Sequence, residues 1–486
     1  MKNYIIAVIL NITLLGLTPV FTGAGLLAQW QPDTRLTNAA GFSTNSDLSS
    51  SGSNLHAVWQ DTRDGNGEIF YKRSTNEGLT WESDIQLTNL VSSKSLPSIS
   101  ASGSNIHIVW QDNRNGNFEI YYKRSTDGGN SWDADVRLTN NSAVSQDAVI
   151  RAEGTAVNVV WRDTRSGNYE IFYKRSTDNG NTWSADTMLT SHTTGLASSI
   201  SLTSTGSNIH VAWSDSRNSD DYEIYYKRST NGGISWGTDT RLTNELRISE
   251  TPEITSNSNE LHVVWTDLRD SNINSEVYYK RSTDNGNTWS ADTRLTIYAY
   301  AMNPDVMLSG SIVHVTWHTV SGSEIYYIRS LNSGNSWETS VQLSSSFSGA
   351  YQPNIAVTGS KAHIIWHDVR NGSTNSEIYY KWNPNGNTIG ISNIAAEIPG
   401  AYSLSQNYPN PFNPTTHFGF RIADFGLVRL SVFDALGKEV TILVNQQLQS
   451  GTYEVSWDAS AYSSGVYFYK LQAGEFTEIK KMILVK

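Results

Sequence analysis

The chain has 486 residues, no cysteine and a formal net charge of -11. The lack of cysteine excludes disulfides and thiolate metal sites. The acidic balance disfavours nucleic acid and anionic membranes as partners, because both attract clustered Lys and Arg. The content of 16 Trp, 24 Tyr and 36 Gly is typical of a soluble β-rich fold with many turns.

Residues 1–28 are predicted to form a secretory signal peptide. Lys2 precedes an apolar run, and small residues follow at 22–25 and at Ala28, so cleavage is expected after Ala24 or Ala28. The alternative is a membrane anchor, but the apolar run is short and Asn11 interrupts it. No later segment is apolar enough to cross a bilayer, so we expect no membrane span once the signal is removed.

An internal repeat occupies residues 29–390. A tryptophan after a β-branched or small residue recurs at Trp59, Trp110, Trp161, Trp213, Trp265, Trp317 and Trp366. The spacing is about fifty residues, which indicates one supersecondary unit copied seven times. In the second unit, strand-like runs at 97–102, 105–112, 118–125 and 135–139 are separated by turns rich in Gly, Asn, Asp and Ser. Four short antiparallel strands per unit predict a seven-bladed β-propeller, since the alternative of separate fifty-residue β-domains would bury little core.

The first strand-like segment is predicted to close the ring. Residues 29–37 read QWQPDTRLT and resemble the last strand of a unit, SWDADVRLT at 131–139. The seventh unit passes Trp366 and then loses the pattern without an RLT strand. We therefore expect the N-terminal strand to complete the seventh blade, which would remove both exposed sheet edges.

The turn after the third strand of most units carries the pattern S-T-[DN]-x-G-x-[ST]-W. It occurs at 74–81, 125–132, 176–183, 229–236 and 282–289, with a weaker copy at 330–337. This pattern resembles the Asp-box of the sialidase (BNR-repeat) superfamily, which implies a turn between the third and fourth strands of a blade. The box residues are Asn76, Asp127, Asp178, Asn231, Asp284 and Asn332. A metal loop is the alternative, but Asn at three boxes would weaken a cation site and leave a turn intact, so neither a metal nor a cofactor is predicted.

A second repeated set is W-x-D-x-R followed by Glu, as in Asp61, Arg63 and Glu68. Two carboxylates beside an arginine also suit glycosidase chemistry. An enzyme needs one asymmetric site, however, so six similar triads favour ion pairs that hold the second hairpin of each blade. Histidines three residues before the tryptophans are likewise interpreted as scaffold. His318 and His367 share a different position in adjacent units, and without a third ligand they do not predict a zinc site.

Residues that differ between the units are the candidates for function. In a propeller the start of each first strand lines the central channel, and the ends of the second strands lie on the same face. Acids, amides, aromatics and a few basic residues gather there, and such side chains suit sugars, which need hydrogen bonds and an apolar stacking plane. An ordinary solvated rim is the competing interpretation. The candidate ligand-binding residues are Asp47, Asp147, Arg151, Arg162, Arg247, Glu253, Asp305, His318, Tyr351, Gln352 and His367.

Resemblance to sialidases implies a Tyr–Glu nucleophile pair, an Asp acid/base and three Arg that bind the substrate carboxylate. The Arg-Ile-Pro segment of that family is missing, and no Arg triad stands apart from the repeated arginines. Catalytic residues therefore cannot be assigned. The first hypothesis is a module that binds glycans or a surface protein; the alternatives are a sialidase-like glycoside hydrolase and a passive surface-layer or adhesive protein.

The repeat ends before a linker at 391–402 and a tail domain at 403–486. The tail contains YPNPFNPTT, VFDALGKEV, SGVYFYKL and a KKMILVK ending. Its alternating strands and Gly turns predict a small β-sandwich. These strings closely resemble the type A sorting domain of type IX secretion. The resemblance implies recognition by the type IX machinery and a secreted or surface-attached protein; Lys480, Lys481 and Lys486 are predicted to aid that recognition.

Overall fold

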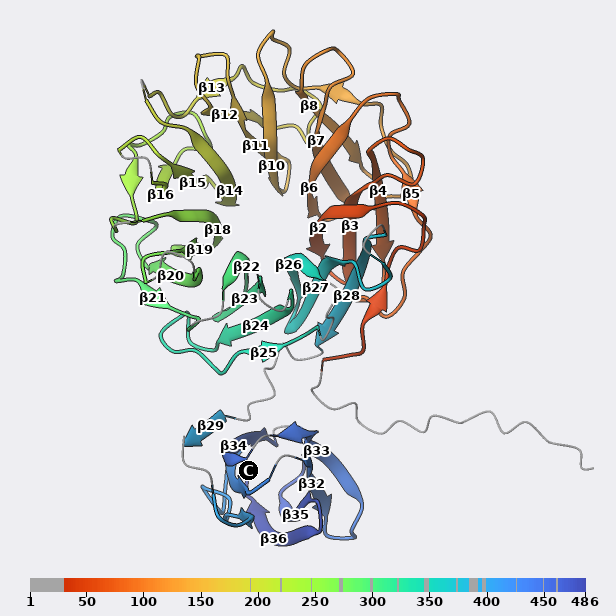
Figure 1. Cartoon of the computed structure of the whole chain (residues 1–486), viewed down its shortest axis with the longest axis vertical. Helices are drawn as coiled ribbons and strands as arrows, with labels where there is room; N and C mark the ends of the chain where they lie inside the picture. Colours follow the sequence, from red (N-terminus) through yellow and green to blue (C-terminus); the bar gives the residue numbers. More distant parts are fainter. Residues whose placement is uncertain are drawn as a thin grey trace, which may run out of the picture. The chain divides into compact units, whose positions relative to one another are not determined.

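The computed structural model describes residues 30–486 apart from short gaps, and the predicted signal peptide lies outside the described residues (Figure 1). The gaps are 193, 219–220, 246, 271–273, 298–299, 321–322, 345–348, 373–374, 384–391, 396–398, 425, 449 and 460–461. The chain divides into two compact units, one within Ala28–Ser392 and one within Asn393–Lys486. Every regular element across the described residues is a β-strand.

The first unit is a ring of seven antiparallel four-stranded sheets (Figure 1). The first strands are β2 (Ser43–Ser51), β6 (Lys94–Ser102), β10 (Ser145–Glu153), β14 (Ala197–Thr205), β18 (Ser249–Asn257), β22 (Ala301–Ser309) and β26 (Ala350–Thr358). The second strands are β3 (Asn54–Asp61), β7 (Asn105–Asp112), β11 (Ala156–Asp163), β15 (Asn208–Asp215), β19 (Glu260–Asp267), β23 (Ile312–Thr319) and β27 (Lys361–Asp368). The third strands are β4 (Glu68–Ser74), β8 (Glu119–Ser125), β12 (Glu170–Ser176), β16 (Glu223–Ser229), β20 (Glu276–Ser282), β24 (Ile325–Ser330) and β28 (Glu377–Asn383). The fourth strands are β5 (Ile85–Gln86), β9 (Val136–Arg137), β13 (Thr187–Met188), β17 (Thr240–Arg241), β21 (Thr293–Arg294), β25 (Val341–Gln342) and β1 (Thr34–Arg35).

Strand β1 closes the ring, as predicted. It pairs antiparallel with β28, with Thr34 opposite Tyr380. Beside this pairing, Leu36 is buried with 4% of its surface exposed, and the Arg35 guanidinium forms an ion pair with Glu377. The prediction of a seven-bladed propeller, whose last blade combines β1 with β26, β27 and β28, is therefore confirmed.

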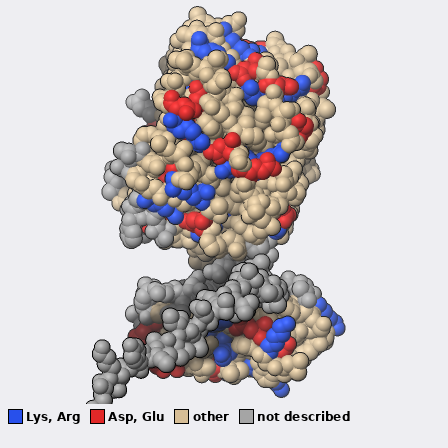
Figure 2. Space-filling view, turned by 90° about the vertical axis from the view of Figure 1, so that its right-hand side faces the viewer, with Lys and Arg blue, Asp and Glu red and all other residues tan. Residues whose placement is uncertain are grey.

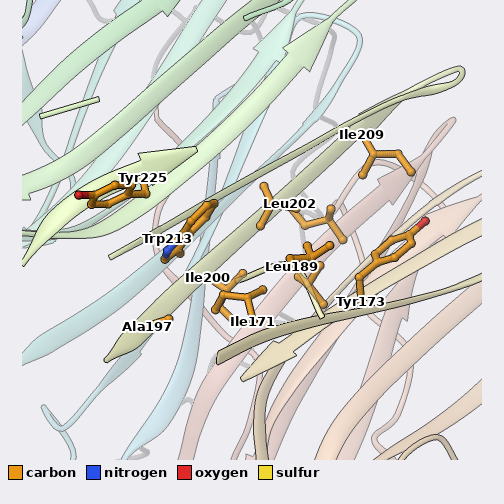
Figure 3. Close-up of a cluster of buried hydrophobic side chains, with 11 residues drawn as sticks. Ile171, Tyr173, Leu189, Ala197, Ile200, Leu202, Ile209, Trp213 and Tyr225 are labelled. Atoms are coloured by element: carbon orange, nitrogen blue, oxygen red, sulfur yellow. The ribbon is translucent and has the colours of Figure 1, made fainter. Parts of the chain in front are cut away.

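The repeated tryptophans lie between sheets. Figure 3 shows one such cluster, in which Trp213 and Leu202 of one blade lie across from Ile171 and Tyr173 of the preceding blade. Trp213 is fully buried, and its Nε1 donates to Asp215 Oδ2 at 2.8 Å. A buried tryptophan N–H gains from an acceptor, and the aspartate two residues later provides it in six of the seven blades.

The same aspartate orients the arginine of the motif. In the first blade, Arg63 Nη2 lies 2.6 Å from Asp61, and Arg63 Nη1 reaches Asp84 at 3.0 Å. The glutamate, predicted to join this hairpin pair, belongs elsewhere: Glu119 is bound by Arg137 of the fourth strand at 2.8 Å. The predicted triad was wrong in this respect. The third strand lies between the second and the fourth strands, and its glutamate faces the fourth.

Acidic and basic side chains also pair with one another on the outer surface of the propeller. Figure 2 shows basic and acidic side chains next to one another on one side of the propeller. Lys72 and Asp84 lie 2.9 Å apart, and Arg73 and Glu82 lie 2.8 Å apart. Each such pair at a surface contributes little stability. The acidic and basic groups of this surface nevertheless balance one another in charge.

Each Asp-box is a turn held by its own side chains. Asp127 Oδ1 accepts from the Ser131 amide at 2.9 Å and from the Ser125 hydroxyl at 2.7 Å. An asparagine can accept the same bond, and Asn76 Oδ1 does so from the Thr80 amide at 2.9 Å. The equivalent bond is present at Asp178, Asn231, Asp284 and Asn332.

The second unit contains two four-stranded sheets, which confirms the predicted sandwich. One sheet orders β29 (Ser392–Ala395), β34 (Gly451–Asp458), β31 (Thr415–Ile422) and β30 (Ser403–Leu404). The other orders β33 (Glu439–Leu448), β32 (Gly426–Asp434), β35 (Gly465–Ala473) and β36 (Phe476–Leu484). Phe418 of one sheet packs edge-on against Tyr469 of the other, with ring centroids 4.6 Å apart. No helix within the described ranges is long and apolar enough to cross a membrane.

Candidate functional site

The first strands of all seven blades surround one cavity at the ring axis. Its volume is about 480 Å³, within the roughly 300–1,000 Å³ of typical small-molecule sites. The charged and amide side chains that line it are Asn45, Asp47, Asp147, Arg151, Arg162, Glu253, Asn303, Asp305, Gln352 and Asn354. Seven of the predicted binding residues therefore meet at one place; the four others, Arg247, His318, Tyr351 and His367, are not among the lining residues.

A backbone bulge near the start of every first strand builds this lining. The strand register shifts between Thr44 and Asp47 of β2, and the other six first strands show the same shift. The third residue has a positive φ in each, at Asn45, Leu96, Asp147, Ser199, Thr251, Asn303 and Gln352. A bulge re-aims side chains, and positive φ is unfavourable for Leu and Thr. A strained backbone feature that repeats seven times thus displays side chains that do not repeat.

Two of the lining carboxylates join neighbouring blades. Asp47 Oδ2 accepts from the Ile99 amide of the next first strand at 2.9 Å. Asp305 Oδ2 accepts from the Ile355 amide at 2.8 Å. First strands of adjacent sheets lack a shared backbone ladder, so these side chains satisfy amides that would otherwise be unpaired. Asp47 and Asp305 therefore have a structural task besides any contact with a ligand.

The two arginines of the cavity already have acidic neighbours. Arg162 Nε lies 2.5 Å from Asp147 Oδ2, and its guanidinium stacks 4.4 Å from the Tyr169 ring centroid. Arg151 donates to the Ile150 carbonyl at 3.0 Å, and its charge acts on Asp47, Glu253 and Asp305. Neither arginine is positioned as a free anion receptor.

The protonation of Glu253 is set by its enclosure. Burial by the surrounding strands, together with the charge of Asp305, raises its pKa above the ordinary 4.5. Ser201 donates to Glu253 Oε2 at 2.6 Å. Burial likewise raises the pKa of Asp305. The native state therefore holds a proton at this cluster more tightly than the unfolded chain does.

This pKa shift predicts a pH dependence of stability. Because the native pKa of Glu253 exceeds its unfolded value, its contribution to stability is lost as pH rises from about 4.5 towards the native pKa. The Glu253→Gln variant cannot ionise, so its Tm should decline less than that of the wild type between about pH 5 and 8. Thermal melts across that range measure the difference. Parallel curves for the two proteins would contradict the assignment.

Three predicted residues form an aromatic group beside the cavity. The Tyr351 ring lies between His318 and His367, with both ring centroids 5.6 Å away. Burial lowers the pKa of each histidine to about 4, so both are neutral at neutral pH. Arg247, the remaining predicted residue, is exposed in the loop before β18. Ser46, Ser199 and Thr251 also line the cavity and were missed, because short hydroxyl residues carry no distinctive sequence signal.

The ring of seven blades with Asp-box turns places the protein in the class of Asp-box β-propellers. The chain belongs to the family described as the BNR repeat-like domain, which matches residues 111–364. A second match, the secretion system C-terminal sorting domain, covers residues 406–486. Both predicted resemblances are thus confirmed, and the sorting domain directs the protein through type IX secretion to the cell surface or the extracellular space.

The chain is similar to several solved structures at low sequence identity, and the first of the three given next shares its fold. The polysaccharide lyase Uly1 has a TM-score of 0.52 and 9% identity, covering 74% of this chain and 100% of the lyase chain. The phage phi92 endosialidase has a TM-score of 0.46 and 11% identity, covering 78% and 72%. A Trypanosoma rangeli sialidase in complex with sialic acid has a TM-score of 0.43 and 11% identity, covering 93% and 88%. No curated protein matches the chain.

Proposed function

We propose that this exported propeller is a glycan-binding protein and that the axial cavity is its binding site. The observation that carries the proposal is the concentration of non-repeated polar side chains in one cavity of about 480 Å³. The rest of the propeller repeats, and its charged groups are used in ion pairs between strands. Side chains without a part in the repeated frame are the ones available to a ligand.

The lining suits sugar hydroxyls. Amides at Asn45, Asn303, Gln352 and Asn354 offer both donors and acceptors, and the carboxylates accept. Tyr351 and its two histidines lie beside Gln352 and supply an apolar ring surface of the kind that packs against a sugar face. Hydrolysis is less favoured, because two of the candidate acids are occupied by amides of the neighbouring blades.

The test is a glycan array probed with the purified full chain, followed by calorimetry on the glycans that bind. Loss of two amide contacts in Gln352→Ala/Asn354→Ala should weaken binding roughly 10-fold, at about 0.5–1.5 kcal/mol for each hydrogen bond. Gln86→Ala is the matched control, since Gln86 is an exposed amide on the fourth strand β5. Absence of binding to any glycan, or equal losses in both variants, would reject the proposal. Turnover of aryl glycosides would assign hydrolysis in its place.

A further inference from the structure

The cavity has an uneven distribution of charge. Four carboxylates line it, Asp47, Asp147, Glu253 and Asp305, against the two guanidinium groups of Arg151 and Arg162, and none of the lining residues is a lysine. Arg162 is paired with Asp147 at 2.5 Å. Arg151 alone then faces the other three carboxylates. The cavity therefore has an excess of acceptors over cations.

The acceptors are concentrated on one arc of the ring. The fifth residues of the seven first strands occupy equivalent registers, and in blade order they are Asp47, Ser98, Val149, Ser201, Glu253, Asp305 and Asn354. The last blade lies next to the first (Figure 1). The fifth, sixth, seventh and first blades are consecutive around the ring, and they contribute a carboxylate, a carboxylate, an amide and a carboxylate, in that order. We call these four side chains the acceptor arc: Glu253, Asp305, Asn354 and Asp47.

Two polar atoms at this arc are left without a protein partner. Ser46, beside Asp47, is only 8% exposed and lines the cavity, yet its Oγ forms no hydrogen bond. Asn354 also lines the cavity, and its buried Oδ1 has no hydrogen-bond partner in the protein. An unpaired polar atom in an enclosed position is costly. These two oxygens are independent of the carboxylate charges, and both can accept from a ligand that donates N–H bonds.

We propose that the acceptor arc selects glycans that carry free amino groups. The inference rests on the glycan-binding function proposed above and specifies its ligand class. A sugar ammonium has three N–H donors and no acceptor, so a carboxylate arc with a free amide oxygen satisfies it fully. An N-acetylated sugar lacks the charge, and an anionic sugar would face the carboxylates with like charge.

The experiment compares three probes on the purified full chain by calorimetry: a glucosamine tetramer, its fully N-acetylated counterpart and tetralysine. The glucosamine tetramer is expected to bind at least 10-fold more tightly than the acetylated one and more tightly than tetralysine. A sugar ammonium beside Glu253 would favour the ionised form of its carboxyl group. Glu253→Gln keeps an acceptor for Ser201 but cannot ionise, so it should reduce that ratio at least threefold, while Gln86→Ala should leave it unchanged.

The outcomes separate this inference from the function on which it rests. Equal or tighter binding of the acetylated tetramer would overturn the inference and leave glycan binding in place. Tighter binding of tetralysine would overturn it in favour of a basic peptide. If the glycan array shows no binding at all, the proposed function fails as well. If the Glu253→Gln variant melts cooperatively and keeps the wild-type ratio of affinities for the glucosamine and acetylated tetramers, the acceptor arc does not select for the amino group.

Discussion

Deletion of residues 30–37 is expected to destabilise the propeller by at least about 5 kcal/mol and to lower its Tm by roughly 10 °C or more. The deletion removes the buried Leu36 from the core. It also leaves Glu377, which is fully buried, without Arg35 and Thr37. Asp33 is lost too, although it lies 2.7 Å from Arg370 and 2.9 Å from Lys381. Calorimetric melts of the deletion variant measure the loss.

The matched control restores the strand without its covalent link. A synthetic peptide of residues 30–38, added to the deletion variant, should raise the Tm in a concentration-dependent way, because binding to the native state alone stabilises it. A scrambled peptide should have no effect. A deletion variant that melts like the wild type would mean that β1 does not hold the ring closed.

Substitution of Lys94 by Met should have the second large effect, a loss of about 3–5 kcal/mol. Lys94 is fully buried, and its Nζ lies 2.9 Å from Glu68. The first blade has Gln86 where the second has Arg137, the residue that neutralises Glu119. Lys94, from the first strand of the next blade, supplies the missing charge. Removing it would leave a buried carboxylate unpaired, and chemical denaturation measures the cost.

Two further variants test this explanation. Lys94→Met combined with Gln86→Arg restores the arrangement of the second blade and should recover most of the lost stability. Glu82→Gln breaks the exposed pair with Arg73 and should cost no more than about 1 kcal/mol. Equal losses in Lys94→Met and Glu82→Gln, or no recovery in the double variant, would contradict the pairing.

The third blade shows a similar replacement that the sequence alone did not reveal. Its fourth strand has Met188 in the arginine position, and His192 Nδ1 lies 2.9 Å from the buried Glu170. A repeated glutamate is visible in the sequence, but its hydrogen-bond or ion-pair partner comes from whichever neighbouring segment can reach it. The predicted Asp–Arg pairs are therefore present, whereas the partner predicted for each glutamate was wrong.

The axial cavity was predicted in outline for a related reason. Side chains at the starts of the first strands differ between units, and the cavity lies at these positions. The bulge that presents them was not predicted, because its third position holds seven side chains of different chemistry, among them Leu96, Ser199 and Gln352. A backbone conformation shared by unlike residues leaves no pattern to read. Tyr351 was placed with the candidates, but its ring packs edge-on against His318 and tilted against His367, and none of the three is a lining residue.

By itself, the sequence determined the number of blades, the turn at each Asp-box, the strand that closes the ring and the sorting domain. The blades and the Asp-box turns are written several times along the chain, the closing strand resembles the last strand of the other units, and the sorting domain carries its own sequence strings. The tertiary structure alone decided which unlike residues meet at the axis. Asp47 and Asp305 come from opposite ends of the repeat and share one cavity because β1 joins the last blade and brings the first blade beside it. Ring closure, a contact made once, thus brings residues that differ between the units into one cavity.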